Sequence, residues 1–127
     1  MNYILDTHIL LWAMYDLKKL SHLSKEILLN ENLTKFISIS SVWEIAIKNR
    51  IGKWPLPDGI SGILSKIESL GYGIITISER HIEIYSALPL LHRDPFDGII
   101  IATAIFEEMT IITADENIQK YDVSWVW

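Results

Sequence analysis

Four acidic residues occupy positions from which a folded chain could bring their carboxylates together. Asp6 and Asp115 each follow a short apolar stretch that is typical of a buried strand. Glu44 and Asp97 each stand near the start of a helix-like segment. In a parallel sheet, the carboxyl ends of the strands and the starts of the following helices lie along one edge. We therefore expect the acids to share one site there, although Asp97 follows a helix and this topology alone does not place it.

The chemistry of such a site follows from charge repulsion. Two carboxylates about 4 Å apart repel by roughly 4 kcal/mol at an effective dielectric constant near 20. Four ionised carboxylates in one cleft therefore require either bound protons or a divalent cation. Ligand sets made only of oxygen favour Mg²⁺ or Mn²⁺. The predicted reaction is metal-assisted hydrolysis of a phosphodiester, in which an activated water attacks in line.

Each acid also has an ordinary structural interpretation. Glu44 would complete a capping box with Ser41 at the start of a helix. Asp97 would interact favourably with the helix dipole, and Asp115 would belong to a turn. Asp6 would cap the helix that follows it. The prediction of a site therefore depends on the four acids together.

The helix that carries Asp97 has a well-defined start and an apolar body. Asp94 suits the N-cap position, because its carboxylate can accept a free N–H of the first turn. Pro95 falls at the first helical position, where its missing N–H costs nothing. The almost unbroken apolar run of residues 99–106 predicts a helix that is buried on most faces.

Strands and helices alternate along the chain. We expect strands over residues 2–5, 35–39, 73–77, 110–113 and 123–126, a loop over 18–23, and helices over 7–14, 24–32, 41–50, 58–70, 79–88 and 95–109. Ser41 is the expected N-cap of the third helix, which ends at Arg50. The pattern predicts a single α/β domain over residues 1–127, with helices on both faces of a mainly parallel sheet of four to five strands.

Composition limits the class of protein. The 127 residues are 50% hydrophobic, contain no cysteine and carry a formal net charge of −5. A disulfide framework is therefore impossible, and a protein that coats nucleic acid is disfavoured. We see no signal peptide and no apolar run that could cross a bilayer, so we expect a cytoplasmic protein. The five Trp suggest partner surfaces, but for Trp43 a core position is an equal alternative.

Other chemistries lack their motifs. The four His show no zinc spacing. Ser40 and Ser41 are not part of a Gly-x-Ser-x-Gly elbow, and the glycines form no phosphate-binding loop. The segment Leu5–His8 lacks the second Asp that an aspartyl-phosphate phosphatase would need.

Several motifs together resemble a known family. They are Tyr3–His8, Ser40–Lys48, Gly52–Pro57, His92–Asp97 with Ile101–Ala104, and Thr113–Asp115. In this order, over nearly the whole chain, they resemble PIN-domain ribonucleases, specifically the VapC-like toxins of bacterial toxin–antitoxin pairs. The resemblance implies a three-layer α/β/α fold and a metal-dependent endoribonuclease toxin that hydrolyses RNA. It also implies a homodimer and a VapB-like antitoxin that inserts a segment over the acidic pocket.

The resemblance assigns the site residues as well. It implies that Asp6, Glu44, Asp97 and Asp115 bind Mg²⁺ or Mn²⁺, which places Asp97 with the other acids. Thr7 and Thr113 resemble supporting residues that hydrogen-bond the acids or the nucleophilic water.

One position departs from the family pattern. Relatives often carry Arg after the Asp-Pro-Phe-Asp motif, whereas this chain has Gly98. Arg93, Lys48 and Arg50 are the cations that could contact phosphate instead, with Arg50 more simply a solvated surface residue. Two alternatives to the ribonuclease remain open: a metal-dependent nuclease or phosphodiesterase acting on DNA or other phosphoesters, and a PIN-like binding module without catalysis.

Overall fold

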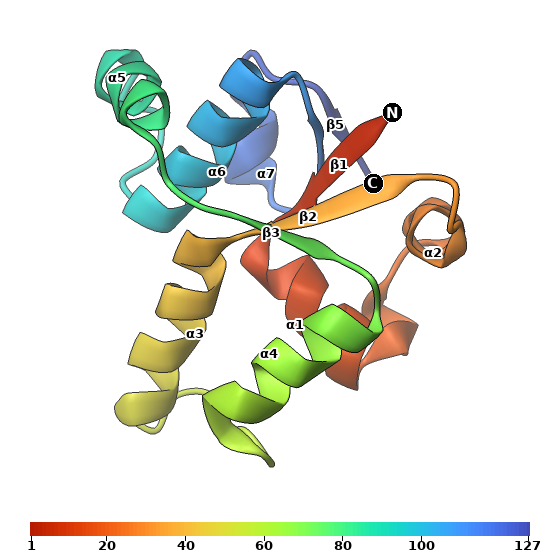
Figure 1. The fold of residues 1–127 in the computed structure, drawn as a ribbon. Coiled ribbons are helices and arrows are strands. Elements are labelled where there is room, and N and C mark those ends of the chain that lie inside the picture. The colour runs from red at the N-terminus through yellow and green to blue at the C-terminus, as the bar shows by residue number, and fades with distance from the viewer.

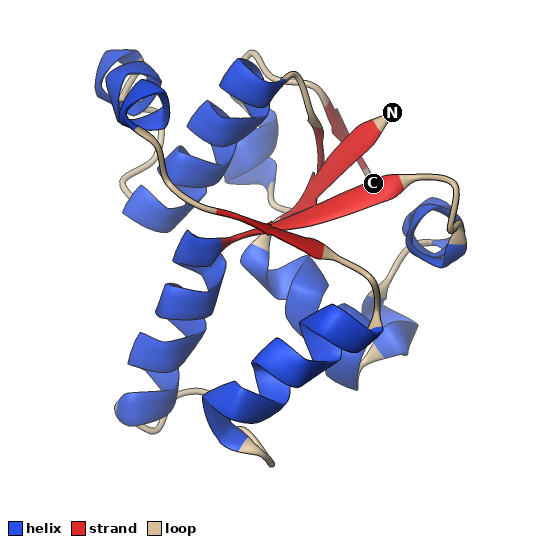
Figure 2. Ribbon diagram, viewed as in Figure 1, coloured by secondary structure: helices blue, strands red, loops and turns tan.

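Five parallel strands form the centre of the molecule in this computed structural model, which describes residues 1–127 (Figures 1 and 2). The strands are β1 (Asn2–Leu5), β2 (Thr34–Ser38), β3 (Gly73–Ile75), β4 (Thr110–Ile112) and β5 (Trp125–Val126). The helices are α1 (Thr7–Tyr15), the 3₁₀ turn η1 (Leu17–Lys19), α2 (His22–Leu29), α3 (Ile39–Arg50), α4 (Gly59–Ser69), α5 (Glu79–Ala87), α6 (Pro95–Glu107) and α7 (Glu116–Gln119). The predicted three-layer α/β/α fold is confirmed.

The strand order is β3-β2-β1-β4-β5, so β1 lies at the centre of the sheet. Leu5 of β1 is in register with Ile37 of β2 on one side and Ile112 of β4 on the other. The chain moves outward in one direction from β1 to β3 and then crosses to the other side of β1 to form β4. This change of direction produces a crevice beside the carboxyl ends of β1 and β4, where open α/β sheets bind ligands.

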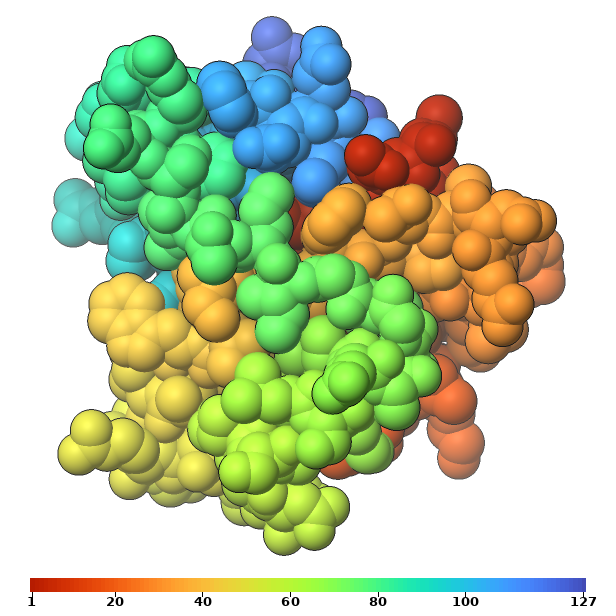
Figure 3. Space-filling model, in the orientation of Figure 1, coloured from red at the N-terminus to blue at the C-terminus, as the bar shows by residue number.

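Alternating residues of the strands face two separate hydrophobic cores. Leu5 packs with Ile9 and Ile45 in a core between the sheet and helices α1–α4. Ile4, its neighbour in β1, packs with Ile100 on the other face, beneath α6 and α7. In Figure 1 these two groups of helices lie on opposite sides of the sheet. Figure 3 shows β3 and α4 (green) in the middle of the surface of the molecule that faces the viewer.

Helix α3 begins earlier than the sequence predicted. Its N-cap is Ser38, whose Oγ accepts a hydrogen bond from the Ser40 amide at 3.1 Å. Ser41 is instead buried within the first turn, where its Oγ accepts a hydrogen bond from Thr7 Oγ1 at 2.9 Å. The predicted capping box of Ser41 and Glu44 is therefore wrong, and Glu44 has no capping role.

Two further segments differ from the prediction. The expected loop over residues 18–23 contains part of η1 and the first turn of α2, which is capped by Ser21. Asp115 is not a simple turn residue, because its side chain caps the short helix α7 through the Asn117 amide at 2.8 Å.

No helix combines the length and the hydropathy that a membrane-spanning segment needs.

Candidate active site

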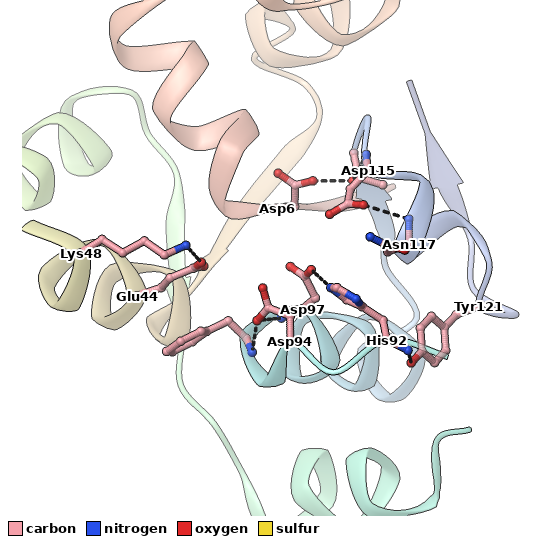
Figure 4. A network of polar contacts seen from close by, with 11 residues as sticks. Asp6, Glu44, Lys48, His92, Asp94, Asp97, Asp115, Asn117 and Tyr121 are labelled. Carbon is pink, nitrogen blue, oxygen red and sulfur yellow. Dashed lines mark hydrogen bonds and ion pairs between the residues drawn. The ribbon is translucent and has the colours of Figure 1, made fainter. Parts of the chain in front are cut away.

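The four predicted acids surround one space at the carboxyl edge of the sheet (Figure 4). Asp6 follows β1 and Asp115 follows β4, so both lie at the crevice where the chain changes direction. Glu44 reaches this space from α3, and Asp97 reaches it from the first turn of α6. The structure therefore brings together all four residues that the sequence singled out.

Asp6 is held in place by the backbone of α1 and by Thr113, which follows β4. Its side chain is buried, with Oδ1 accepting a hydrogen bond from the Ile9 amide at 2.9 Å. Oδ2 accepts a second hydrogen bond from Thr113 Oγ1, which itself accepts one from the Asp115 amide at 3.0 Å. Thr113 thus joins two acids of the site. Burial raises the pKa of the Asp6 carboxyl, and the hydrogen bond from Thr113 opposes that rise.

Asp97 has the most unfavourable electrostatic surroundings of the four. Burial raises the pKa of its carboxyl to about 8, and the negative charges of Asp94, Asp115, Asp6 and Glu44 contribute to the rise. Its Oδ2 lies 3.1 Å from Nε2 of His92. A carboxyl with this pKa holds a proton at neutral pH unless a cation takes the proton's place.

Glu44 is buried, but only one of its two carboxylate oxygens has a hydrogen-bond partner. Its Oε2 accepts a hydrogen bond from Lys48 Nζ at 2.6 Å, and this lysine is the only Lys or Arg that forms an ion pair with any of the four acids. Its Oε1 has no hydrogen-bond partner. A buried carboxylate oxygen without a partner is costly, and in a functional cleft it points to a ligand.

His92 is a site residue that the sequence reasoning missed. One ligand atom from each of His92, Asp94 and Asp97 lies within 4.8 Å of the others. The His92 amide also donates to the Tyr121 hydroxyl at 3.1 Å, which fixes the loop before α6. The four His show no zinc spacing in the sequence, and the contact of His92 with Asp97 exists only because the turn capped by Asp94 brings the two side chains together.

Asp94 performs the capping role that was predicted for it. Its Oδ1 accepts hydrogen bonds from the amides of Phe96 at 2.9 Å and Asp97 at 3.4 Å. This cap, followed by Pro95, sets the direction of the first turn and hence of the Asp97 side chain. Thr7, by contrast, bonds Ser41 and none of the acids.

The departure at Gly98 has a physical explanation. A Cβ atom at this position would lie 2.3 Å from Cε1 of Tyr85, so the tyrosine ring on α5 occupies the space that a side chain would need. Through this ring, α5 packs against the start of α6. An arginine at this position would therefore displace Tyr85.

The donor set fits a hard divalent cation. All four acids offer carboxylate oxygens, and oxygen is the ligand that Mg²⁺ and Mn²⁺ prefer. The unpartnered Oε1 of Glu44 and the raised pKa of Asp97 both indicate that the negative charge is not neutralised by the protein itself. A cation among these oxygens would remove both penalties.

The chain matches the PIN domain family over residues 3–124 and therefore belongs to that family. No sequence among the curated proteins matches it.

Solved structures share the fold over nearly the whole chain. VapBC2 from Rickettsia felis, bound to a DNA fragment from their promoter, contains a chain with 22% identity and a TM-score of 0.77, and the match covers 99% of this chain and 98% of that one. FitAcB from Neisseria gonorrhoeae is similar at 18% identity and a TM-score of 0.69, with coverage of 98% and 96%. A toxin–antitoxin complex from Klebsiella pneumoniae is similar at 22% identity and a TM-score of 0.67, also with coverage of 98% and 96%.

Proposed function

We propose that this PIN domain is an endoribonuclease toxin that depends on Mg²⁺ or Mn²⁺ and hydrolyses RNA phosphodiester bonds. The observation that carries the proposal is the convergence of four acids, one with an unpartnered buried oxygen, at the crevice between β1 and β4. Such a concentration of carboxylates suits the binding of a cation together with phosphate oxygens.

Each residue has a defined task in this mechanism. Asp6 and Asp97 would hold the cation, and Glu44 and Asp115 would complete the pocket directly or through water. When bound, the cation would activate the attacking water and stabilise the charge that develops on the phosphate. Thr113 positions Asp6 and Asp115 through its two hydrogen bonds.

Two basic side chains complement the acids. His92 contacts Asp97 and orients its carboxylate. Lys48 neutralises one oxygen of Glu44 and brings a positive charge to the rim of the site. We assign to Lys48 the task of attracting the substrate phosphate, because Arg93 and Arg50 are exposed and form no ion pair with an acid of the site.

The toxin assignment comes from the structural neighbours. The similar chains belong to complexes described as VapBC2 and as a toxin–antitoxin complex. We propose by analogy that this chain is neutralised by a VapB-like antitoxin and forms a homodimer.

Cleavage assays with three substrates test the proposed activity. Purified wild-type protein with Mn²⁺ or Mg²⁺ should cut single-stranded RNA and leave single-stranded DNA and a chromogenic phosphodiester intact. Asp6→Asn should lower the RNA cleavage rate by at least about a hundredfold, since it removes a carboxylate that holds the cation. Preferential cleavage of DNA would establish the alternative nuclease, and no cleavage of any substrate would favour a binding module.

A further inference from the structure

A row of aromatic side chains borders the acidic site and has no task in the mechanism above. It consists of His8, Trp12, Trp54 and Trp127, which we call the aromatic wall. His8 contacts Trp54 with ring centroids 5.5 Å apart and Trp12 with centroids 6.2 Å apart. Trp12 in turn contacts Trp127 at 6.0 Å. The wall therefore runs without a break from the first turn of α1 to the carboxyl end of the chain.

The aromatic wall opens directly onto the acids. His8 and Trp12 line a cavity of about 160 Å³ whose other walls include Asp6 and Asp115. A second, apolar groove of about 350 Å³ is lined by Trp12 and Trp54. Trp12 thus stands between two open spaces, one acidic and one apolar. Because a water molecule takes up about 30 Å³ of liquid, the acidic cavity has room for a group of several heavy atoms.

The rings of the wall are inclined to one another. The planes of neighbouring rings are inclined at 54° for His8 and Trp12, 77° for His8 and Trp54, and 58° for Trp12 and Trp127. None of these pairs is stacked in parallel. Lys19 Nζ lies over the Trp12 ring, 5.8 Å from its centroid. A planar ligand would therefore lie against the part of the Trp12 ring that lines the acidic cavity.

A cation connects the wall to the catalytic acids. Lys48 Nζ lies 4.1 Å from the centroid of the Trp54 ring and also forms the ion pair with Glu44. A phosphate group near Lys48 would consequently have aromatic surface on one side and the acids on the other. Aromatic surface can stack a base, and a cation beside the acidic pocket can contact the phosphate, so this arrangement suits a nucleotide.

We propose that the aromatic wall binds an unpaired nucleobase next to the scissile phosphate, with Trp12 as the stacking residue. The proposal rests on the proposed function and narrows its substrate class to single-stranded RNA, because a base in a duplex is already stacked and cannot lie on Trp12. His8 is exposed at the mouth of the cavity and provides a polar contact for the base or its sugar.

Trp43 provides a matched control. It is 61% exposed and directly precedes Glu44, so it also lies near an acid of the site in sequence. Its ring, however, makes an edge contact with Phe96 at 5.3 Å and lines neither of the two cavities. A general effect of removing any surface tryptophan would appear in Trp43→Leu as well as in Trp12→Leu.

The experiment measures binding separately from cleavage. Asp97→Asn protein, used so that RNA stays intact, is titrated against a fluorescein-labelled single-stranded oligoribonucleotide and against an abasic oligomer of the same length. Trp12→Leu in this background should weaken binding of the oligoribonucleotide about tenfold and leave the abasic oligomer unchanged. Trp12→Phe should retain most of the affinity, and Trp43→Leu should retain all of it.

Several outcomes would overturn the proposal. If Trp12→Leu bound the oligoribonucleotide as tightly as the Asp97→Asn protein with Trp12 intact, stacking would be excluded. An equal loss of affinity in Trp43→Leu would also exclude it, as would the absence of binding to either oligomer. His8→Ala, at an exposed position, checks the wall with little risk to folding and should weaken binding of the base-containing oligomer alone. Base-dependent binding without any RNA cleavage by wild-type protein would support the wall and contradict only the proposed function.

Discussion

At the scale of single residues, Asp97 combines two demands that conflict in the metal-free protein. Its place in the first turn of a buried helix suits a negative charge, but burial and four neighbouring acids raise its pKa to about 8. His92 is the one basic side chain in contact with it. The residue is therefore suited to exchanging a proton for a cation.

The raised pKa predicts how stability depends on pH without metal. Between the ordinary value of 3.8 and about 8, folded Asp97 keeps a proton that the unfolded chain has lost, so this residue lowers the free energy of unfolding as pH rises through that range. Asp97→Asn does not titrate. The free energy of unfolding of Asp97→Asn, relative to that of wild type, should therefore rise by more than about 1 kcal/mol between pH 5 and pH 8.

Urea denaturation in EDTA at the two pH values measures this difference. Asp16→Asn, at a distant helix end, serves as the control and should show the pH dependence of wild type. Parallel curves for Asp97→Asn and wild type would contradict the assigned environment of Asp97.

Thr113 is expected to act through the acids that it positions. Thr113→Val removes the hydrogen bonds to Asp6 Oδ2 and from the Asp115 amide while keeping the side-chain shape. The loss of such supporting contacts typically weakens metal affinity by about 10- to 100-fold. Thr110 begins the strand that Thr113 follows, and its hydroxyl hydrogen-bonds Ser124 at the surface. Thr110→Val should leave Mn²⁺ affinity unchanged in a titration. Equal Mn²⁺ affinity of Thr113→Val and Thr110→Val would show that Thr113 does not support the acids of the site.

The sequence identified these acids by type and position, and it failed where contacts depend on folding. Asp6 and Asp115 could be predicted because strand ends are visible as apolar runs. The contact between His92 and Asp97 depends on the turn that Asp94 caps, and the bond from Thr7 to Ser41 depends on the approach of α1 to α3. Neither contact has a signature in local sequence.

At the scale of elements, helix α6 explains the placement of Asp97. The crossover from β3 to β4 runs antiparallel to the strands, so the helix that precedes β4 begins at the carboxyl edge of the sheet. This rule could have placed Asp97 from the sequence. The start of α3 could not be predicted in the same way, because three serines compete for the cap and packing against Thr7 selects Ser41 for the interior.

The contact between Tyr85 and Gly98 predicts coupling between α5 and α6. In wild type, Gly98→Ala should destabilise the protein by about 1 kcal/mol, since the new methyl group displaces the Tyr85 ring. In a Tyr85→Ala background the same change should stabilise by up to about 1 kcal/mol, because alanine favours helix more than glycine does. Chemical denaturation of the four proteins of this double-mutant cycle gives both values, and additive effects would contradict the contact.

At the scale of the whole molecule, the fold and the site are supported by different forces. Two hydrophobic cores, one on each face of the sheet, contain most of the buried residues. The acids lie at the edge of the sheet, outside both cores, where their mutual repulsion lowers stability. The binary pattern of the strands and helices was therefore sufficient to predict the layers, and the site was predictable only from its charged residues.

This separation predicts the effect of metal on unfolding. In EDTA the protein should remain folded and melt cooperatively, because the cores do not include the acids. Saturating Mn²⁺ should raise the melting temperature of wild type, since a ligand that binds only the folded state stabilises it. The rise should be smaller in Asp6→Asn at the same Mn²⁺ concentration, and circular dichroism melts with and without Mn²⁺ measure it. Unfolding of wild type by EDTA would contradict the separation of fold and site.

Calorimetric titration of Mn²⁺ measures whether the four acids form one cation site. Wild-type protein should show saturable binding, Asp6→Asn and Asp97→Asn should each weaken it by at least about tenfold, and Asp16→Asn should bind as wild type does. If Asp97→Asn protein bound Mn²⁺ as tightly as wild type, Asp97 would not be part of a cation site.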